Sequence, residues 1–386
     1  MHTHAMVRNR PATALGHAVA LCLTLMVGAP ALWAAGMNSY TQHNLVSDGY
    51  VRADHTDPNL VNPWGLAFNP HRDIWVTDTG SGLSTLYDSA GNPVSLVVKI
   101  PGGSPTGIVY NTSPGFVVHK GVTFGASTFI FASESGRISG WNYNVDSTHA
   151  ITMVDNGTSG AIYKGLAIID AGGSVPRIYA TDFHHGRIDV FDLHFGQAYL
   201  QPGAFTDHHL PKGFAPFGIQ AIDGKLYVTY AKQDRARQDE IDGAGLGYVD
   251  VYNANGRLLR RLVSRGYLNA PWGLAKAPAD FGRFSHSLLV ANFGDGTIDA
   301  YSITSGRFEG QLKRPDHRPL KIDGLWGIRF GNGQRHQPIN ALFFTAGPDH
   351  EKHGLYGRID AKVSQGKTTG GNTAWPTGSG GYAGGY

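Results

Sequence analysis

The feature that most constrains the fold of this chain is a sixfold repeat centred on a glycine. An aromatic or turn residue precedes the glycine in most units, and an apolar run follows it. The motif recurs at intervals of roughly 42–58 residues, at Gly65, Gly107, Gly165, Gly218, Gly273 and Gly327. Self-similarity at about this period is typical of propellers, solenoids and other repeat architectures.

The rest of each unit indicates which of these architectures is present. In the fourth unit the glycine run at 215–219 is followed by short apolar or alternating runs at 225–234, 247–253 and 258–264, with turn signals between them. Four short antiparallel strands in each of six units, with no convincing helix, predict an all-β fold, a six-bladed β-propeller. The sixth unit lacks a fourth run, whereas residues 39–48 alternate and have no other place. We expect this N-terminal strand to complete the last blade and close the ring, which favours a monomer.

The segments that flank the repeats predict an exported protein. Residues 1–36 combine Arg8 and Arg10, an apolar run and a small-residue stretch, which is the layout of a signal peptide. We therefore expect a secreted or periplasmic propeller over residues 37–366, with no membrane span after cleavage. Residues 367–386 are rich in Gly, Ser and Thr and are predicted to be disordered. The only cysteine, Cys22, lies in the leader, so the mature chain has no thiol to form a disulfide or ligate a metal.

Charge and motif content exclude several function classes. The 32 Lys and Arg nearly balance the 29 Asp and Glu, which argues against a nucleic-acid partner. The chain has no P-loop and no dinucleotide fingerprint in a strand-to-helix context, so no nucleotide cofactor is expected. It also lacks the G-x-S-x-G motif of serine hydrolases.

Propeller connectivity predicts where a site should lie. The chain enters each innermost strand, and leaves each second strand, on the same face around the channel mouth. Aromatic residues are expected to rim this mouth, either as wedges between blades or as a platform for a small-molecule or polymer ligand: Trp64, Phe217, Trp272 and Trp326. The same face is expected to carry many acidic residues, among them Glu134, Asp239 and Glu240.

Three loops carry the most metal-like sequences. Residues 349–353 read DHEKH, in which His350 and His353 could converge with Glu351 as a base or ligand. The long loop 231–245 could bind calcium through Asp234, Asp239 and Asp242, or it could be a solvated surface loop. His184 belongs to an adjacent histidine pair that could ligate copper or zinc, although neighbouring strand residues point to opposite faces.

Several segments resemble one family of propellers. These include LVNPWGLAF (60–68), GYVDVYNANGRLLRRL (247–262) and LLVANFGDGTIDAY (288–301). The chain resembles the NHL and SMP-30/gluconolactonase-like superfamily, and more closely a bacterial secreted family associated with PEP-CTERM sorting signals. The lactonase branch holds one divalent metal with a Glu, two Asn and an Asp. The resemblance assigns ligand roles to Asn62, Asn269 and Asp323, without a counterpart for the Glu in the first unit.

Three functions follow as hypotheses. The first is a hydrolase of an ester, lactone or similar small carbonyl compound, assisted by a divalent cation such as Ca or Zn, with His350 or His353 as the base. The second is a non-catalytic extracellular module that binds a glycan, polymer or protein. The third is an oxidative enzyme or lyase with copper or zinc at His184, His350 and His353.

Overall fold

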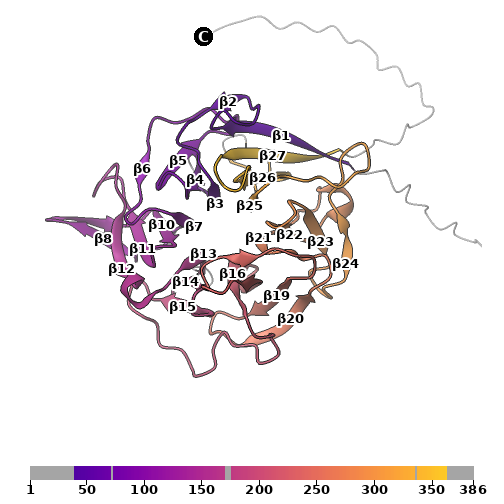
Figure 1. Cartoon of the computed structure of the whole chain (residues 1–386). Coiled ribbons are helices and arrows are strands. Elements are labelled where there is room, and N and C mark those ends of the chain that lie inside the picture. The colour runs from indigo at the N-terminus through magenta and orange to yellow at the C-terminus, as the bar shows by residue number, and fades with distance from the viewer. Residues whose placement is uncertain (1–38, 71–72, 170–174, 335–336, 363–386) are drawn as a thin grey trace, which may run out of the picture. The chain divides into compact units, whose positions relative to one another are not determined.

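Short antiparallel strands pack around a common axis in the computed structural model of this chain, which describes residues 39–70, 73–169, 175–334 and 337–362. The strands form six sheets arranged in a ring (Figure 1), so the predicted six-bladed β-propeller is confirmed. The expected leader (1–36) and the expected tail (367–386) lie outside the described residues. Within the described ranges no helix is long and apolar enough to cross a bilayer.

The first three blades follow one another along the chain. Blade one contains β3 (Pro63–Phe68), β4 (Ile74–Asp78), β5 (Leu83–Tyr87) and β6 (Val98–Lys99). Blade two contains β7 (Pro105–Tyr110), β10 (Phe129–Ser133), β11 (Arg137–Trp141) and β12 (Ile151–Asp155), and a separate hairpin of β8 (Val117–Lys120) and β9 (Thr123–Ala126). Blade three is a three-stranded sheet of β13 (Tyr163–Ile169), β14 (Arg177–Asp182) and β15 (Arg187–Phe191), preceded by the short helix η1 (Gly157–Ser159).

The other three blades complete the ring. Blade four contains β16 (Phe214–Ile222), β17 (Lys225–Gln233), β18 (Glu240–Ile241), β19 (Gly247–Tyr252) and β20 (Leu258–Ser264). Blade five contains β21 (Pro271–Lys276), β22 (Leu288–Asn292), β23 (Ile298–Tyr301) and β24 (Phe308–Gln311), with the short helix η2 (Gly282–Phe284). Blade six contains β25 (Leu325–Phe330), β26 (Ala341–Ala346), β27 (Leu355–Lys362), β1 (Ser39–Ser47) and β2 (His55–Thr56).

The N-terminal strand closes the ring as expected. β1 pairs antiparallel with β27 from Ser39 opposite Lys362 to Ser47 opposite Leu355. The Tyr40 side chain is buried and its hydroxyl donates to the carbonyl of Phe281 in blade five. The first and last parts of the described chain therefore share one sheet, and that sheet is packed against its neighbour.

The repeated glycines allow the innermost strands to approach each other. A β-carbon added to Gly65 would lie 2.5 Å from the carbonyl oxygen of Thr106 in blade two, and one on Gly327 would lie 2.4 Å from the carbonyl oxygen of Trp64 in blade one. A real β-carbon does not approach an oxygen so closely, so these positions require glycine. Similar contacts link every blade to the next, which explains why the glycine recurs in each unit.

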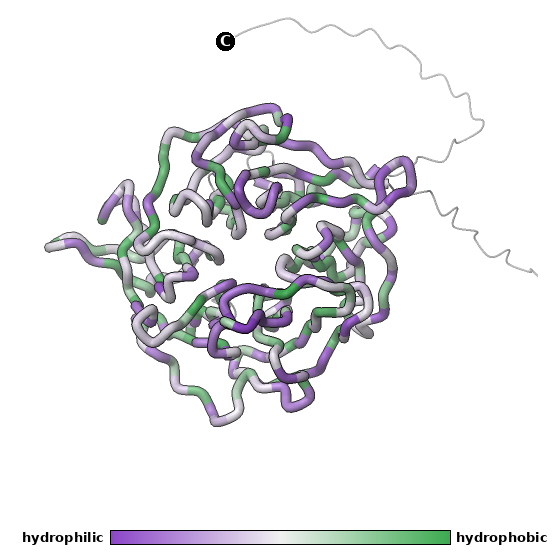
Figure 2. The backbone as a smooth tube through the Cα atoms, viewed as in Figure 1, coloured by the Kyte–Doolittle hydropathy of each residue, from purple (hydrophilic) through white to green (hydrophobic). Residues whose placement is uncertain are grey.

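Threonines on the second strands join neighbouring blades at the same level. The Thr77 hydroxyl accepts from the amide of Gly65 and donates to the carbonyl of Thr106, at 2.8 and 2.7 Å. Thr345 makes the corresponding pair of bonds to Gly327 and Trp64. Each hydroxyl satisfies buried backbone groups of two blades. Apolar residues fill the spaces between the sheets, whereas hydrophilic segments lie largely in the loops (Figure 2).

Candidate active site

The residue before each repeat glycine lies at one end of the central channel. Three blades carry tryptophan there, one carries phenylalanine and one carries threonine, and blade three carries Lys164. The Trp64 and Trp326 rings stack with their centroids 3.6 Å apart, and Trp272 meets both edge-on at 6.0 Å. Phe217 contacts the Trp64 and Trp326 rings from its own blade. The aromatic residues therefore form a packed floor across the channel.

This packing limits what the predicted aromatic rim can do. The exposed fractions of Trp64, Phe217 and Trp326 are 2 %, 0 % and 0 %, so their ring faces are not available to stack on a ligand. Trp272 is half-buried, and its indole Nε1 donates to the carbonyl oxygen of Lys164 at 2.9 Å. The structure places all four residues in contact with protein, packed against one another across the channel.

Lys164 lies on this floor with its ammonium among acidic side chains. It is only 1 % exposed, and its Nζ lies 2.5 Å from Oε1 of Glu134 and 3.1 Å from Oδ1 of Asp239. The ammonium also lies 5.1 Å from the centroid of the Trp64 ring, within cation–π range. Burial by itself lowers the pKa of Lys164, but the surrounding carboxylates, Glu134 first among them, outweigh it and raise the pKa above its ordinary value. The lysine is therefore a fixed positive charge.

Glu240 is the most perturbed acid of this group. It begins the short strand β18, between β17 and β19, and its Oε2 is buried without a hydrogen-bond partner in the described part of the chain. The pKa of Glu240 is raised to about 8, chiefly by burial; Lys164 opposes the rise, and the nearby charges of Glu351 and Asp239 contribute to it. The side chain therefore remains a neutral carboxylic acid at pH 7, which is the form that can donate a proton.

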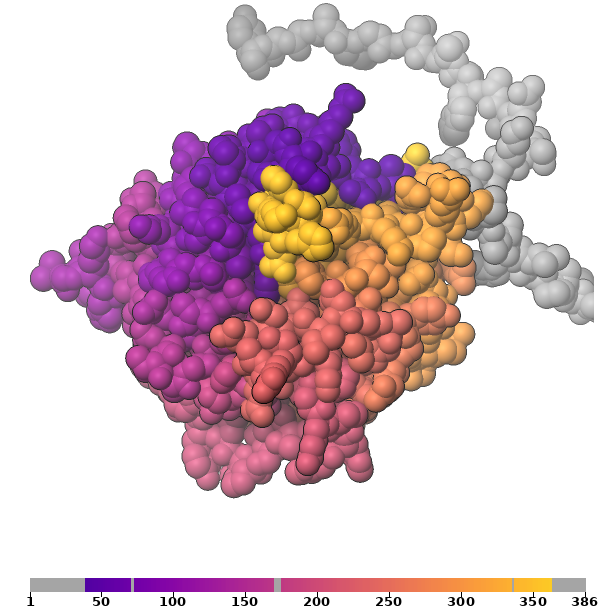
Figure 3. Space-filling view, viewed as in Figure 1, coloured from indigo at the N-terminus to yellow at the C-terminus, as the bar shows by residue number. Residues whose placement is uncertain are grey.

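Glu351 approaches the same point from blade six. Its Oε2 accepts from Nδ2 of Asn62 at 2.8 Å, while Oδ1 of Asn62 accepts from the indole of Trp326 at 3.0 Å. Burial raises the pKa of Glu351, and the Asn62 amide and Lys164 partly offset this effect. Figure 3 shows the yellow segment of blade six and the salmon loop of blade four meeting over the centre of the ring.

The backbone that carries Glu351 is strained. Asp349, His350 and Glu351 have φ values of 54°, 54° and 66°, so three successive non-glycine residues adopt the left-handed conformation. Each such residue costs of order 1 kcal/mol or more, and such strain concentrates at functional sites. The turn is held by a hydrogen bond from the Glu351 amide to the carbonyl of Gly347, and it directs Glu351 toward Asn62.

The three residues to which the resemblance assigns metal-ligand roles are not brought together in the structure. The side-chain amide of Asn62 donates to Glu351 and accepts from Trp326. Oδ1 of Asn269 accepts from the amide of Gly243 at 2.7 Å. Asp323 is exposed and accepts from the amide of Asp349 at 3.0 Å. The three side chains thus serve different local contacts in blades one, five and six.

The three loop residues expected to bind calcium also have different partners, and Asp239 is paired with Lys164. Oδ1 of Asp234 accepts from the amides of Gln238 and Asp239, so this carboxylate stabilises the turn of its own loop. Asp242 lies beside Gly294 and Asn269 at the start of blade five, and burial followed by the charge of Asp295 raises its pKa. The described ranges contain no group of three His, Cys, Asp or Glu side chains placed to hold a metal ion.

The predicted histidines likewise lie in different surroundings. Nδ1 of His353 lies 2.7 Å from Oδ2 of Asp48, and its ring stacks on Tyr50 at 3.9 Å. His350 is exposed on the strained turn. The ring of His184 meets that of His185 at 4.9 Å, and its Nδ1 is buried without a partner in the described part of the chain.

Of the predicted catalytic residues, Glu351 thus belongs to the titratable cluster at the mouth, which we define as Glu134, Lys164, Asp239, Glu240 and Glu351. It draws charged side chains from blades two, three, four and six. Lys164 was missed because a lysine within a strand motif carries no local sign of a site. The signal was present, since Lys164 occupies the position at which three other units have tryptophan.

The fold is shared with solved propellers. A glucose dehydrogenase matches with a TM-score of 0.51 and 13% sequence identity, covering 83% of this chain and 100% of that protein. A streptogramin B lyase matches with a TM-score of 0.48 and 13% identity, covering 85% of this chain and 99% of that protein. At 13% identity the likeness to the glucose dehydrogenase concerns the fold alone.

Sequence relatives come from a virus. No protein-family model matches the chain. Uncharacterized protein R648 of Acanthamoeba polyphaga mimivirus is 35% identical over 325 residues, which cover 82% of this chain and 78% of the relative. Uncharacterized protein L690 of the same virus is 32% identical over 325 residues, covering 82% and 84%. These relatives do not support the bacterial, PEP-CTERM-associated origin that we expected from the resemblance. The chain belongs to the family that includes the mimivirus proteins R648 and L690.

Proposed function

We propose that this propeller is an enzyme that hydrolyses a small ester or lactone at the channel mouth, with Glu240 and Glu351 as the proton-transfer groups. One observation carries the proposal. Three of the chain's four glutamates meet around the buried ammonium of Lys164, and the pKa of one of them, Glu240, is raised to about 8. Strongly perturbed carboxyl groups gathered at the mouth of a channel are typical of catalytic sites.

The two glutamates fit complementary roles. Glu351, once ionised, is a stronger base than an ordinary carboxylate because its pKa is raised, so it can take a proton from the attacking water. Glu240, neutral at pH 7, can donate a proton to the leaving alkoxide when the C–O bond breaks. The balance is water plus ester giving acid plus alcohol, with one proton passing into Glu351 and one out of Glu240.

Lys164 supplies the fixed charge of the site. Its ammonium lies beneath the carboxylates and is immobilised by Glu134, Asp239 and the Trp64 ring. A preorganised positive charge in a site of low dielectric constant favours the negative charge that develops on a carbonyl oxygen during hydrolysis. In this proposal Lys164 provides the electrostatic stabilisation that we had expected from a divalent cation.

The metal-assisted version of this hydrolase has less support. It would need oxygen ligands from Asn62, Asn269, Asp323, Asp234 or Asp242, and the described contacts of these residues are with separate protein groups. The copper or zinc hypothesis needs His184, His350 and His353 to lie close together. His184 contacts His185, whereas His353 contacts Asp48, so these histidines have different surroundings. The binding-module hypothesis relied on aromatic faces that the floor buries.

The test is a pH–rate profile on a panel of simple alkyl esters and lactones, whose alkoxide leaving groups need a proton. We expect turnover to fall above pH 8 as Glu240 ionises and to fall in acid as Glu351 becomes protonated. Glu240→Gln is expected to lower kcat by about 100-fold or more, the usual contribution of an acid–base group. The matched control is Glu309→Gln, because Glu309 lies in β24, outside the cluster, and accepts from Ser287.

Two outcomes would overturn the proposal. One is an E240Q variant as active as E309Q. The other is activity that a chelator abolishes and that E240Q leaves unchanged, which would restore the metal-assisted mechanism. Absence of turnover across the whole panel would contradict the substrate class. Export of the chain is a separate proposal, based on the leader-like residues 1–36, and the N-terminus of the mature protein tests it.

A further inference from the structure

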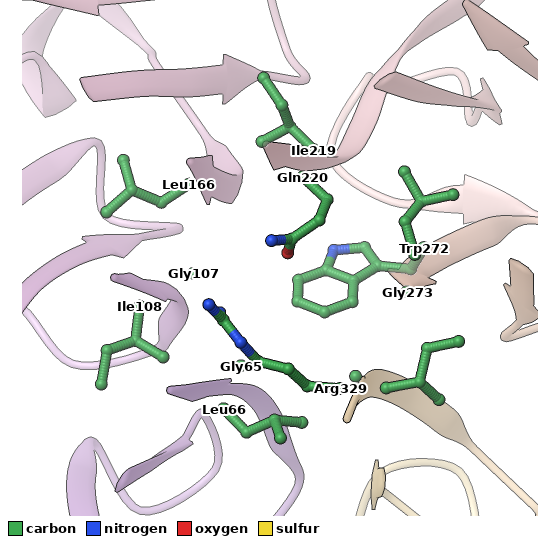
Figure 4. A pocket seen from close by; sticks show the side chains of 13 residues that line it. Gly65, Leu66, Gly107, Ile108, Leu166, Ile219, Gln220, Trp272, Gly273 and Arg329 are labelled. Carbon is green, nitrogen blue, oxygen red and sulfur yellow. The ribbon is translucent and has the colours of Figure 1, made fainter. Parts of the chain in front are cut away.

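A second polar site lies within the channel, on the other side of the aromatic floor from the cluster. A cavity of about 40 Å³ is lined by the six aliphatic residues that follow the repeat glycines, Leu66, Ile108, Leu166, Ile219, Leu274 and Ile328. Trp272, Gln220 and Arg329 complete the polar part of its wall. Figure 4 shows the side chains of Arg329 and Gln220 pointing into the middle of this cavity.

The two polar residues interrupt an otherwise apolar repeat. Arg329 and Gln220 stand two positions after their glycines, where the other four units have alanine or valine. Their blades, six and four, flank blade five, which contributes Trp272 and Leu274 to the same wall. Blades four and six thus each place one long polar side chain in the channel, and neither is required by the repeat.

Arg329 has no counter-charge in this cavity. The lining includes no Asp or Glu, and within the described part of the chain the guanidinium makes no hydrogen bond or ion pair. Burial lowers the pKa of Arg329, yet a guanidinium stays protonated at neutral pH. Charged groups enclosed by apolar walls are normally paired, because an unpaired charge in a medium of low dielectric constant is costly.

A neighbouring pocket extends the cavity. Arg329, Gln220 and Leu274 also line a pocket of about 290 Å³, together with the apolar side chains of Ile222, Ala275 and Phe330. The one acid in its lining, Asp223, is already paired with Lys276 at 2.5 Å. This pocket could therefore take the apolar part of a ligand whose charged group reaches Arg329.

We propose that the channel binds the carboxylate group of a small organic acid at Arg329, with Gln220 as a second donor and the adjoining pocket around its short aliphatic chain. The planar fork of a guanidinium matches a carboxylate through two parallel hydrogen bonds, which a halide cannot form. The site is independent of the proposed hydrolysis, since none of its residues belongs to the cluster at the mouth.

The experiment is calorimetric titration of the full chain with acetate, butyrate and chloride at constant ionic strength. We expect saturable one-to-one binding of acetate, and tighter binding of butyrate by roughly fourfold for each methylene that enters the pocket. Arg329→Gln should weaken both carboxylates at least tenfold, and Arg329→Lys should lose part of the affinity. The control is Arg257→Gln, an exposed arginine on the outer turn of blade four.

The wild-type chain also gives a test that does not depend on variants. Because a ligand of the folded state stabilises it by mass action, the melting temperature should rise with butyrate concentration and not with chloride. The proposal is wrong if R329Q binds acetate as tightly as R257Q does. It is also wrong if chloride binds as well as the carboxylates, which would indicate a site for any small monoanion, or if no anion binds the wild type.

Discussion

A β-carbon on Gly218 would lie 2.0 Å from the carbonyl oxygen of Trp272 in the next blade. The innermost strands of blades four and five therefore touch backbone to backbone, with no room for a side chain. Gly165 of blade three lies in the same way against the backbone of Phe217 in blade four. The ammonium of the adjacent Lys164 donates to Glu134 of blade two and Asp239 of blade four and lies near Glu351 of blade six.

Gly218→Ala should therefore destabilise the propeller strongly. The obstacle is the backbone of β21, which cannot rotate away, so the blades must separate or strain. We expect a loss of about 3 kcal/mol in the free energy of unfolding, comparable with overpacking of a core. Urea denaturation measures it, and Gly196→Ala is the control because its nearest neighbours belong to the Asp192 side chain. Equal stability of the two variants would contradict the ring of close contacts.

Thr345→Val tests the contact between blade six and blade one, where the ring of blades closes. The Thr345 hydroxyl accepts from the amide of Gly327 and donates to the carbonyl of Trp64, so valine leaves two buried backbone groups unpaired. A loss of about 1–3 kcal/mol is expected in urea denaturation. The control is Thr152→Val, at an exposed position of β12, which should change the free energy of unfolding by less than about 0.5 kcal/mol. A T345V protein as stable as T152V would show that the two hydrogen bonds of the Thr345 hydroxyl do not stabilise the fold.

Lys164→Met should destabilise the protein in a pH-dependent way. Removal of the ammonium leaves Glu134, Asp239, Glu240 and Glu351 without their shared positive partner. Breaking a fully buried pair typically costs about 3–5 kcal/mol, and because the Asp239 side chain is 73 % exposed we expect a loss of about 3 kcal/mol. The loss should be larger at pH 8 than at pH 5, where the carboxyl groups take up protons and their repulsion falls. Urea denaturation at both pH values, with exposed Lys352→Met as the control, checks this. A loss that is the same at both pH values would contradict the assignment of the cluster.

Glu240 should also make the stability of the wild type depend on pH. Its pKa is about 8 in the folded chain, against an ordinary value of 4.5, so the folded state holds a proton that the unfolded state has released. The free energy of unfolding should accordingly be highest below pH 4.5 for this group and should decrease between pH 4.5 and 8. Glu240→Gln, which is always neutral, should remove this decrease. A slope in that window that E240Q leaves unchanged would assign it to other groups.

The sequence was sufficient for the blades because their signals are local and repeated. The glycine motif, the alternating runs and the unpaired segment at 39–48 each correspond to a strand, and β20 (Leu258–Ser264) has the predicted bounds. The hairpin β8–β9 and the short strand β18 were missed because they lie in connections that have no counterpart in the other units. Blade three shows three strands where four were expected, and the chain beyond β15 contributes only a bridge between Phe191 and Gln197.

The site was less predictable because it depends on which loops meet. Glu134, Asp239, Glu240 and Glu351 were correctly expected on one face, since connectivity fixes the face. Their convergence on Lys164 depends on the left-handed turn at 349–351 and on the path of the long loop in blade four. Neither feature has a local pattern. Arg329 was missed for a different reason, because a single arginine in an inner strand gives no sign of being unpaired.

The most direct test of the central claim is to titrate the side-chain carboxyl groups by ¹³C NMR after glutamate labelling. The chain has four glutamates, so four resonances are expected and E240Q assigns one of them. The account predicts that the Glu240 resonance titrates near pH 8, and that the Glu351 resonance titrates above its ordinary range. If all four carboxyl groups titrate between pH 4 and 5, the mouth holds no neutral acid at pH 7, and the proposed proton-transfer site is contradicted.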